Sequence, residues 1–264
     1  MDGGGVVRDA QVTPEGARIR WVEMPGDPRR ATRVYLHGLG ASAAPYFAAS
    51  AAHPALAGHR SLLVDLLGFG ISDRPTDFAY TLEDHADTVA AALEAAEVQT
   101  ADVIGHSMGG AVAIVLAARH PHLVGRLVLV DAALDPVPIA HGLPGASGIA
   151  AYTEEEFLVG GWRRVRENAG PHWWSTMRLA GREALYRSAT HRALGTEPAL
   201  RDTLLALPIP RAYLRPEADQ PLPGAQELAE AGVEVVSIPD CGHNIMLDNP
   251  EAFARATAHA LRET

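Results

Sequence analysis

Cysteine is almost absent from this chain of 264 residues, since Cys241 is the only one. A single cysteine excludes an intramolecular disulfide framework. Long apolar runs are also missing, and no stretch approaches the roughly 20 residues that a membrane-spanning helix needs. The first ten residues carry glycines and charges instead of the apolar run of a signal peptide, which favours a cytoplasmic protein.

Basic residues are scarce relative to acidic ones. The chain has 22 lysines and arginines against 32 aspartates and glutamates, a formal net charge of -10. Nucleic acids and anionic membranes are therefore unfavoured partners, because both bind through a positive surface. No pair of histidines has the spacing of a metal motif such as H-E-x-x-H, so we expect no metal site. A monomer and a homodimer both remain open.

Segments typical of strands and helices alternate along much of the chain. This rhythm predicts an α/β fold with a mostly parallel central sheet flanked by helices. A helix is expected to start at Leu82, because Thr81 and Asp84 have the spacing of a variant capping box. The other expected helices cover residues 108–119, residues 225–231 and a last segment with Pro250 near its start. The expected strands are 17–22, 33–36, 61–65, 101–104, 126–130, 211–214 and 233–238.

The alternation stops between residues 134 and 207. This stretch contains three of the four tryptophans, and residues 154–166 and 173–194 have helical patterns without a clear strand between them. The chain therefore divides into a core formed by residues 1–133 and 208–264 and a helical insertion, the cap, formed by residues 134–207.

A G-x-S-x-G sequence, Gly105-His-Ser107-Met108-Gly109, lies between an expected strand and an expected helix. This context is the one in which the motif forms a nucleophile elbow, a tight turn that exposes the serine above the sheet. The backbone N–H of Met108 would then lie near the helix start, where the helix dipole favours a developing negative charge. Ser107 is the predicted nucleophile.

The elbow resembles that of the α/β-hydrolase fold family, and the family pattern can be followed over nearly the whole chain. His37-Gly-Leu39-Gly40 is similar to the family's oxyanion loop, which implies that the backbone N–H groups of Leu39 and Met108 form the oxyanion hole. The segment from Asp65 to Pro75 resembles a loop whose usual role is structural. In Asp240-Cys-Gly-His243-Asn, the family's Gly-His loop identifies His243 as the base.

The acid of the expected triad is the least determined member. The resemblance implies Asp219, in the segment after the strand at residues 211–214, although Pro216 stands where the family has a glycine. Glu217 is one alternative. Asp131 is another, because some members of the family take the acid from the end of the preceding strand. The acid would accept the imidazole N–H and stabilise the imidazolium.

The resemblance implies a serine hydrolase that cleaves a carboxylic ester, lactone or thioester through an acyl-enzyme, without a cofactor. The cap would line the pocket of a small-molecule substrate, and Trp162, Trp173 and Trp174 are candidates for an apolar wall there. An equally open interpretation is that these tryptophans fill the cap's own core. The cluster of Arg163, Arg164 and Arg166 is better explained as a solvated helix face than as a carboxylate site.

Other functions remain possible on the same residues. The triad could serve a C–C bond hydrolase, a biosynthetic cyclase or an acyltransferase, and a non-catalytic ligand-binding protein can keep the same residues. A dinucleotide site at Gly38–Ala43 is a weaker alternative, because it leaves the elbow and the Gly-His loop unexplained.

Overall fold

The computed structural model describes residues 5–136 and 147–262. An eight-stranded sheet in the order β1-β2-β4-β3-β5-β6-β7-β8 forms the centre of the molecule. β1 and β2 pair antiparallel, as do β2 and β4, and all the other neighbours are parallel. The strands are β1 Val6–Gln11, β2 Arg18–Met24, β3 Thr32–Leu36, β4 Ser61–Asp65, β5 Ala101–His106, β6 Val124–Val130, β7 Arg211–Pro216 and β8 Val233–Ile238.

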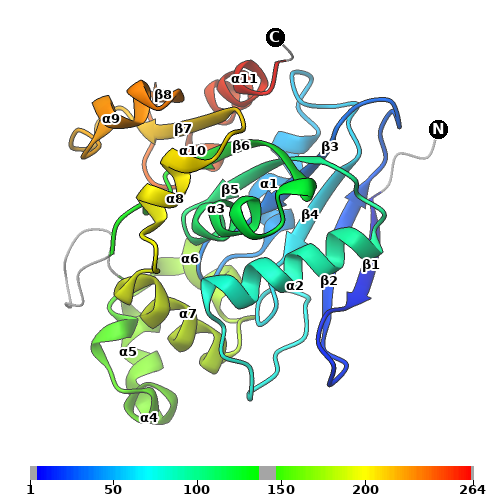
Figure 1. Ribbon diagram of the computed structural model, residues 1–264. Helices are drawn as coiled ribbons and strands as arrows, with labels where there is room; N and C mark the ends of the chain where they lie inside the picture. The colour runs from blue at the N-terminus through cyan, green and yellow to red at the C-terminus, as the bar shows by residue number, and fades with distance from the viewer. Residues whose placement is uncertain (1–4, 137–146, 263–264) are drawn as a thin grey trace.

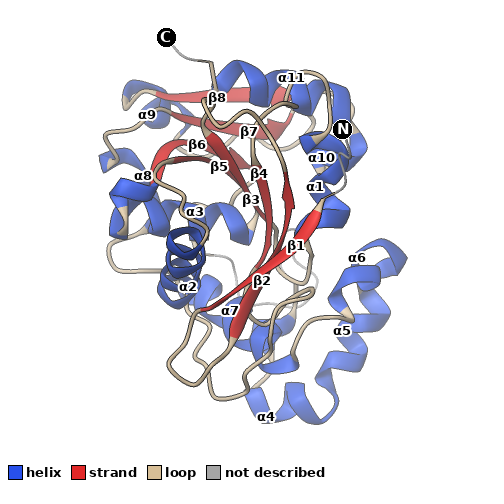
Figure 2. Cartoon of the chain, turned by 90° about the vertical axis from the view of Figure 1, so that its right-hand side faces the viewer, coloured by secondary structure: helices blue, strands red, loops and turns tan. Residues whose placement is uncertain are grey.

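Helices cover both faces of this sheet. Figure 2 shows α2 (Leu82–Ala95) and α3 (Met108–Arg119) on one side and α1 (Ala43–Ala51), α10 (Ile245–Asp248) and α11 (Pro250–Ala260) on the other. Consecutive side chains of β6 point alternately to the two faces of the sheet and pack against the helices on each face. Leu127 and Leu129 belong to the apolar cluster under α2 and α3, whereas Val128 and Val130 belong to the cluster under α1 and α11. A strand buried on both faces therefore has a continuous apolar sequence, as β6 does.

The expected fold class is confirmed, and the strands that the sequence predicted are present with ends displaced by at most two residues. The capping box of α2 is also present, because the Thr81 side chain accepts from Asp84 N and the Asp84 side chain accepts from Thr81 N. Asn249 caps α11, with Pro250 at its first position. The sequence analysis missed β1 and α1. β1 is an edge strand with mostly exposed residues, so it lacks the apolar pattern of a buried strand.

Only helices join β6 to β7 in the part of that connection that the structure describes. They are a 3-10 turn at Ile149–Ala151, α4 (Glu154–Glu156), a π-turn at Phe157–Gly161, α5 (Trp162–Asn168), α6 (Gly170–Met177), α7 (Arg182–Leu194) and α8 (Leu200–Ala206). Outside this connection, a 3-10 turn at Pro121–Leu123 precedes β6, and α9 (Ala225–Glu230) follows β7. Residues 137–146 of the expected insertion lie outside the described residues.

The helices α4 to α7 gather beyond one end of the sheet, whereas α8 returns to pack on α3 (Figure 1). The helix expected over residues 173–194 is wrong in one respect, because residues 178–181 separate α6 from α7. At this break Gly181 N donates to Gly68 O of the core, so the chain turns where it touches the loop after β4. No helix within the described ranges is long and apolar enough to span a membrane.

Candidate active site

The loops that follow β3, β5, β6, β7 and β8 meet at the carboxyl edge of the sheet, where ligands bind in open α/β sheets. They enclose a cavity of about 710 Å³ together with residues from the connection between β6 and β7. The lining side chains and backbone belong to Gly38, Leu39, Ala41, Tyr46, His106, Ser107, Asp131, Ser147, Trp173, Arg192, Asp219, Gln220, His243 and Asn244. Three distant segments of the chain therefore bring a hydroxyl, a carboxylate and an imidazole to one cavity.

Ser107 lies at a sharp turn between β5 and α3. Its backbone has φ 52° and ψ -117°, a strained conformation for a residue with a side chain. The turn is closed by the N–H of Ser107, which donates to Val130 O of the neighbouring strand. The Ser107 side chain makes no capping hydrogen bond to α3. The hydroxyl is thus held at the cavity by the backbone and is not engaged in holding the helix.

Glycines make this turn possible because other chain segments approach it very closely. A Cβ at Gly109 would lie 2.4 Å from Leu36 O, and one at Gly105 would lie 2.5 Å from Gly109 O. Both distances are far below a carbon–oxygen contact, so no side chain fits at either position. The two glycines of the motif are required by packing between β3, β5 and α3, which brings the oxyanion loop next to the serine.

The carboxylate that contacts His243 is that of Asp131. Its Oδ2 lies 2.6 Å from His243 Nδ1, the length of a charge-assisted hydrogen bond. Asp219, the acid favoured in the sequence analysis, also lines the cavity, but its recorded contact is through its backbone oxygen, which accepts from Arg215. Glu217 is exposed, and its backbone N–H donates to Ile238 O. The structure therefore replaces Asp219 with Asp131 as the partner of His243.

Asp131 is placed by the end of β6. Its backbone N–H donates to Leu214 O of β7, and its φ of 44° turns the side chain away from the strand direction. Aspartate is one of the few residues that tolerate this region of backbone conformation. Burial raises the pKa of the neighbouring Tyr213 hydroxyl, and the charge of Asp131 raises it further. Tyr213 thus stays a neutral donor, and its hydroxyl donates to Ala132 O, the backbone carbonyl of the residue after Asp131.

His106, the residue before Ser107 in the elbow, also belongs to the site. It lines the cavity, and its ring centroid lies 4.6 Å from that of His243. The Nε2–H of His106 donates to the backbone oxygen of His243 at 2.9 Å. Burial, and then the nearby charge of His243, hold the pKa of His106 well below its usual value. A neutral His106 therefore fixes the loop that carries His243.

The oxyanion loop is held from below by His37, which is fully buried. Leu66 N donates to His37 Nε2 at 3.1 Å, so Nδ1 carries the proton and donates to Gly38 O at 2.8 Å. Burial lowers the pKa of His37, which agrees with this neutral tautomer. The carbonyl of Gly38 and the N–H of Leu39 belong to one planar peptide group. By holding that carbonyl, His37 also sets the direction of the Leu39 N–H.

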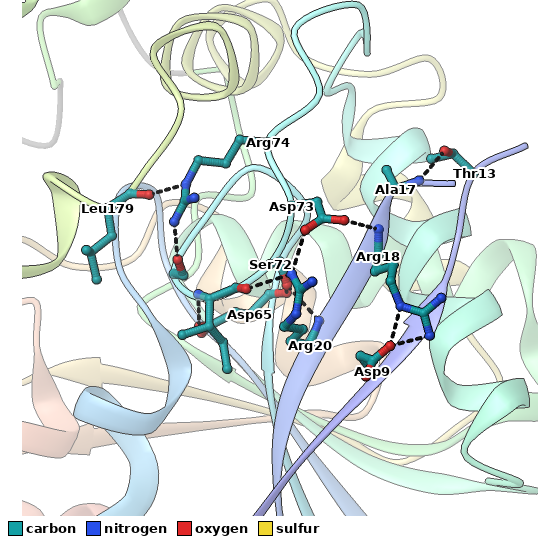
Figure 3. A network of polar contacts seen from close by, with 12 residues as sticks. Asp9, Thr13, Ala17, Arg18, Arg20, Asp65, Ser72, Asp73, Arg74 and Leu179 are labelled. Carbon is teal, nitrogen blue, oxygen red and sulfur yellow. Dashed lines mark hydrogen bonds and ion pairs between the residues drawn. The ribbon is translucent and has the colours of Figure 1, made fainter. Parts of the chain in front are cut away.

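The loop after β4 is structural, as the resemblance implied. Asp65 accepts from Ser42 Oγ, Ala43 N and Ile71 N, which joins this loop to the start of α1. Asp73 accepts from Arg18 N and Arg20 in β2, and the Ser72 hydroxyl donates to Asp65 O (Figure 3). The network continues through Arg74 to Leu179 O in the helical connection. Neither Asp65 nor Asp73 lines the cavity.

A comparison with protein families identifies the chain. The family model described as the alpha/beta hydrolase fold matches residues 34–208, which include the oxyanion loop and the elbow. The chain belongs to the α/β-hydrolase fold family.

Its relatives include enzymes of more than one kind. A 2-hydroxymuconate semialdehyde hydrolase of Pseudomonas sp. (strain CF600) is 29% identical over 242 residues, which are 86% of each chain. The solved esterase from Exiguobacterium antarcticum has a TM-score of 0.77 at 20% identity, over 98% of this chain and 100% of the other. The meta-cleavage product hydrolase from Pseudomonas fluorescens IP01 has a TM-score of 0.67 at 21% identity, over 96% of each. At these identities the solved structures establish the fold alone.

Of the three tryptophans expected at the pocket of this α/β-hydrolase, Trp173 alone is in its lining. Trp162 packs between two guanidinium groups, with Arg182 at 4.2 Å and Arg163 at 4.9 Å from its ring centroid. Trp174 stacks on Arg166 at 5.0 Å. Cation–π stacking thus explains why these two rings stay in the helical connection, and the prediction that they line the pocket is wrong. The cluster of Arg163, Arg164 and Arg166 is exposed.

The basic residue that does line the cavity is Arg192 of α7, which the sequence analysis did not single out. Burial lowers the pKa of its guanidinium, and its charge contributes to the lowered pKa of His106. The cavity lining therefore contains a cationic group whose charge acts on His106 of the elbow. No sequence motif marks Arg192, because its role depends on how α7 is placed over the sheet. Within the described residues no cluster of histidine, cysteine or acidic side chains could hold a metal ion.

Proposed function

We propose that this chain is a serine hydrolase that cleaves a carboxylic ester or related acyl bond, with Ser107 as nucleophile, His243 as base and Asp131 as acid. The observation that carries the proposal is the 2.6 Å contact between Asp131 Oδ2 and His243 Nδ1 at a cavity that Ser107 also lines. An imidazole whose Nδ1–H is held by a carboxylate presents Nε2 as the proton acceptor. The helical insertion is the proposed cap over this site.

The proposed reaction has two steps. Ser107 Oγ attacks the substrate carbonyl while His243 Nε2 takes its proton, and the N–H groups of Leu39 and Met108 stabilise the oxyanion. The bond to the alcohol breaks, and the alcohol leaves with the proton from His243. Water then attacks the acyl-enzyme with the same histidine as base, releasing the acid and restoring the Ser107 hydroxyl.

A fluorophosphonate probe tests the nucleophile directly. We expect the probe to label Ser107 in the folded protein, and peptide mapping to locate the adduct there. In the variant His243→Ala the labelling rate should fall by at least 10²-fold, because general-base assistance contributes about 10²–10⁴-fold. Labelling at another residue, or equal labelling of both proteins, would contradict the proposed roles.

The second candidate is a C–C bond hydrolase that acts on a carbonyl substrate with a carboxylate. Two observations favour it. The 2-hydroxymuconate semialdehyde hydrolase matches 86% of this chain, and Arg192 places a cationic side chain in the cavity. A guanidinium in a partly dehydrated cavity binds a carboxylate through charge-assisted hydrogen bonds. In this candidate the same triad acts, and the leaving group is a carbon that takes up the proton.

A variant of Arg192 tests whether the substrate is anionic or neutral. We expect Arg192→Met to lower kcat/KM for mono-p-nitrophenyl succinate by roughly 10- to 100-fold, the equivalent of one hydrogen bond to a charged group. Hydrolysis of neutral p-nitrophenyl butyrate should change little. Arg166→Met is the matched control, because Arg166 is exposed and outside the cavity lining. Equal losses for the two esters would show that Arg192 supports the fold of the cap and not substrate charge.

A further inference from the structure

The helix α6 of the cap lies directly on the oxyanion loop. The indole Nε1–H of Trp173 donates to Leu39 O at 2.9 Å, which joins residues 134 positions apart in the chain. The neighbouring His172 ring lies 5.7 Å from the ring of Tyr46 in α1, the helix that follows the oxyanion loop. Two consecutive residues of α6 thus contact the core beside the cavity.

The fit between the indole and this loop is tight. Gly40 has φ 68°, and a Cβ there would lie 2.8 Å from Trp173 Nε1 and 3.4 Å from Leu185 Cδ2. The indole therefore occupies the space that a side chain at position 40 would need. A glycine at this position serves two purposes: it permits the left-handed backbone and it lets the cap reach the Leu39 carbonyl.

The two peptide groups on either side of Leu39 are held by different parts of the molecule. In the first group, Gly38 O accepts from His37 Nδ1 and from Ala41 N, both of which belong to the core. In the second group, Leu39 O accepts from Trp173 of the cap. Since each peptide is planar, fixing both carbonyls fixes both backbone torsions of Leu39 and the direction of its N–H.

We propose that Trp173 is a positioning residue that couples the seating of the cap to the geometry of the oxyanion hole. The inference rests on the proposed function, because it concerns the N–H of Leu39 as an oxyanion donor. Trp173 acts through the loop and not on the substrate oxygen itself. A cap that is seated holds the Leu39 peptide in its donating orientation, and a cap that is displaced releases it. Preorganised donors lose their effect on the transition state once they must reorient.

Trp173→Phe removes the indole N–H and keeps an aromatic wall. We expect kcat/KM for a p-nitrophenyl ester to fall roughly tenfold, as one hydrogen bond allows, through kcat and not KM. Affinity for a trifluoromethyl ketone, which forms an oxyanion on Ser107, should fall by the same factor. Affinity for the corresponding secondary alcohol, which has no oxyanion, should stay the same. A merely structural loss would weaken both ligands.

Trp174→Phe is the matched control. Trp174 is the next residue of α6, but it stacks on Arg166 and is not part of the cavity lining. We expect this variant to behave as the unmodified protein with all three ligands. The positioning role would be refuted if Trp173→Phe had the same kinetics and affinities as Trp174→Phe. It would also be refuted if Trp173→Phe lost affinity for the ketone and for the alcohol equally. Failure of the proposed function is distinguishable, because the unmodified protein would then neither turn over the ester nor bind the ketone covalently.

Discussion

Replacing Ser107 with alanine should reduce ester turnover roughly 10⁵- to 10⁶-fold, the loss typical of removing a catalytic serine from a triad that acts as a unit. The physical reason is that, among residues 5–136 and 147–262, Ser107 is the one cavity hydroxyl that a strained turn at a helix N-terminus holds in place. The residual rate should come from the oxyanion donors and from substrate binding alone. Steady-state kinetics with p-nitrophenyl acetate, on protein free of contaminating esterases, measures this change.

The fold should survive this substitution. An N-terminal cap serine usually contributes about 0.5–2 kcal/mol through its side-chain hydrogen bond, but the Ser107 side chain makes no such bond to α3. Alanine adopts the φ of 52° with the same steric cost as serine, since both carry one Cβ. We expect the midpoint of thermal unfolding to shift by no more than a surface substitution would shift it.

Ser147→Ala is the control for this experiment, because Ser147 also lines the cavity but lies outside the elbow. Its turnover should remain within a few-fold of the unmodified protein. Full turnover in Ser107→Ala would place the chemistry at another residue, whatever the result for Ser147.

The positions of Ser107 and His243 at one cavity could be predicted from sequence because the motifs that contain them are local. A strand, a Gly-x-Ser-x-Gly turn and a helix follow one another within residues 101–119, so the residues that the sharp turn requires stand next to one another in the sequence. The same holds for α2, whose start is fixed by Thr81 and Asp84 three residues apart. Physical constraints that act over a few residues leave a pattern in the sequence.

The carboxylate that contacts His243 could not be chosen in this way. β6 and β7 are adjacent parallel strands, and Val130 pairs with Leu214, so the loops that follow them leave the sheet at the same edge. Both loops bring a carboxylate to the cavity. The choice depends on the positive φ of Asp131, which has no sequence signal of its own, and on the course of the loop from Pro216 onwards. Pro216 marks a departure from the family pattern, but it does not say which carboxylate reaches His243.

The pocket wall was predicted least well, for a related reason. Nothing in the sequence around the tryptophans and arginines between β6 and β7 tells one from another, because their environments are set by how the helices pack. Trp162 and Trp174 find guanidinium partners, whereas Trp173 finds a carbonyl of the core. Arg192 reaches the cavity because α7 lies across α2, a contact between elements about 100 residues apart.

Asp131→Asn should lower kcat roughly 10⁴-fold, as expected when the acid of a triad loses its charge and the imidazole takes the wrong tautomer. The amide can still occupy the space of the carboxylate, but its NH₂ group cannot stabilise an imidazolium at 2.6 Å. Asparagine is at least as tolerant as aspartate of the φ of 44° at this position, so the fold should be retained. Kinetics at several pH values and circular dichroism would separate the two effects.

Asp219→Asn is the matched control, because it removes the charge of the other carboxylate that lines the cavity. Asp219 is exposed at the mouth of the cavity, and its recorded contact with Arg215 uses the backbone oxygen, which the substitution leaves in place. Its kcat should therefore stay within about threefold of the unmodified protein, as for a surface substitution worth up to about 0.5 kcal/mol. The reverse order of losses would mean that His243 turns to Asp219 during catalysis, and that its contact with Asp131 belongs to the resting protein alone.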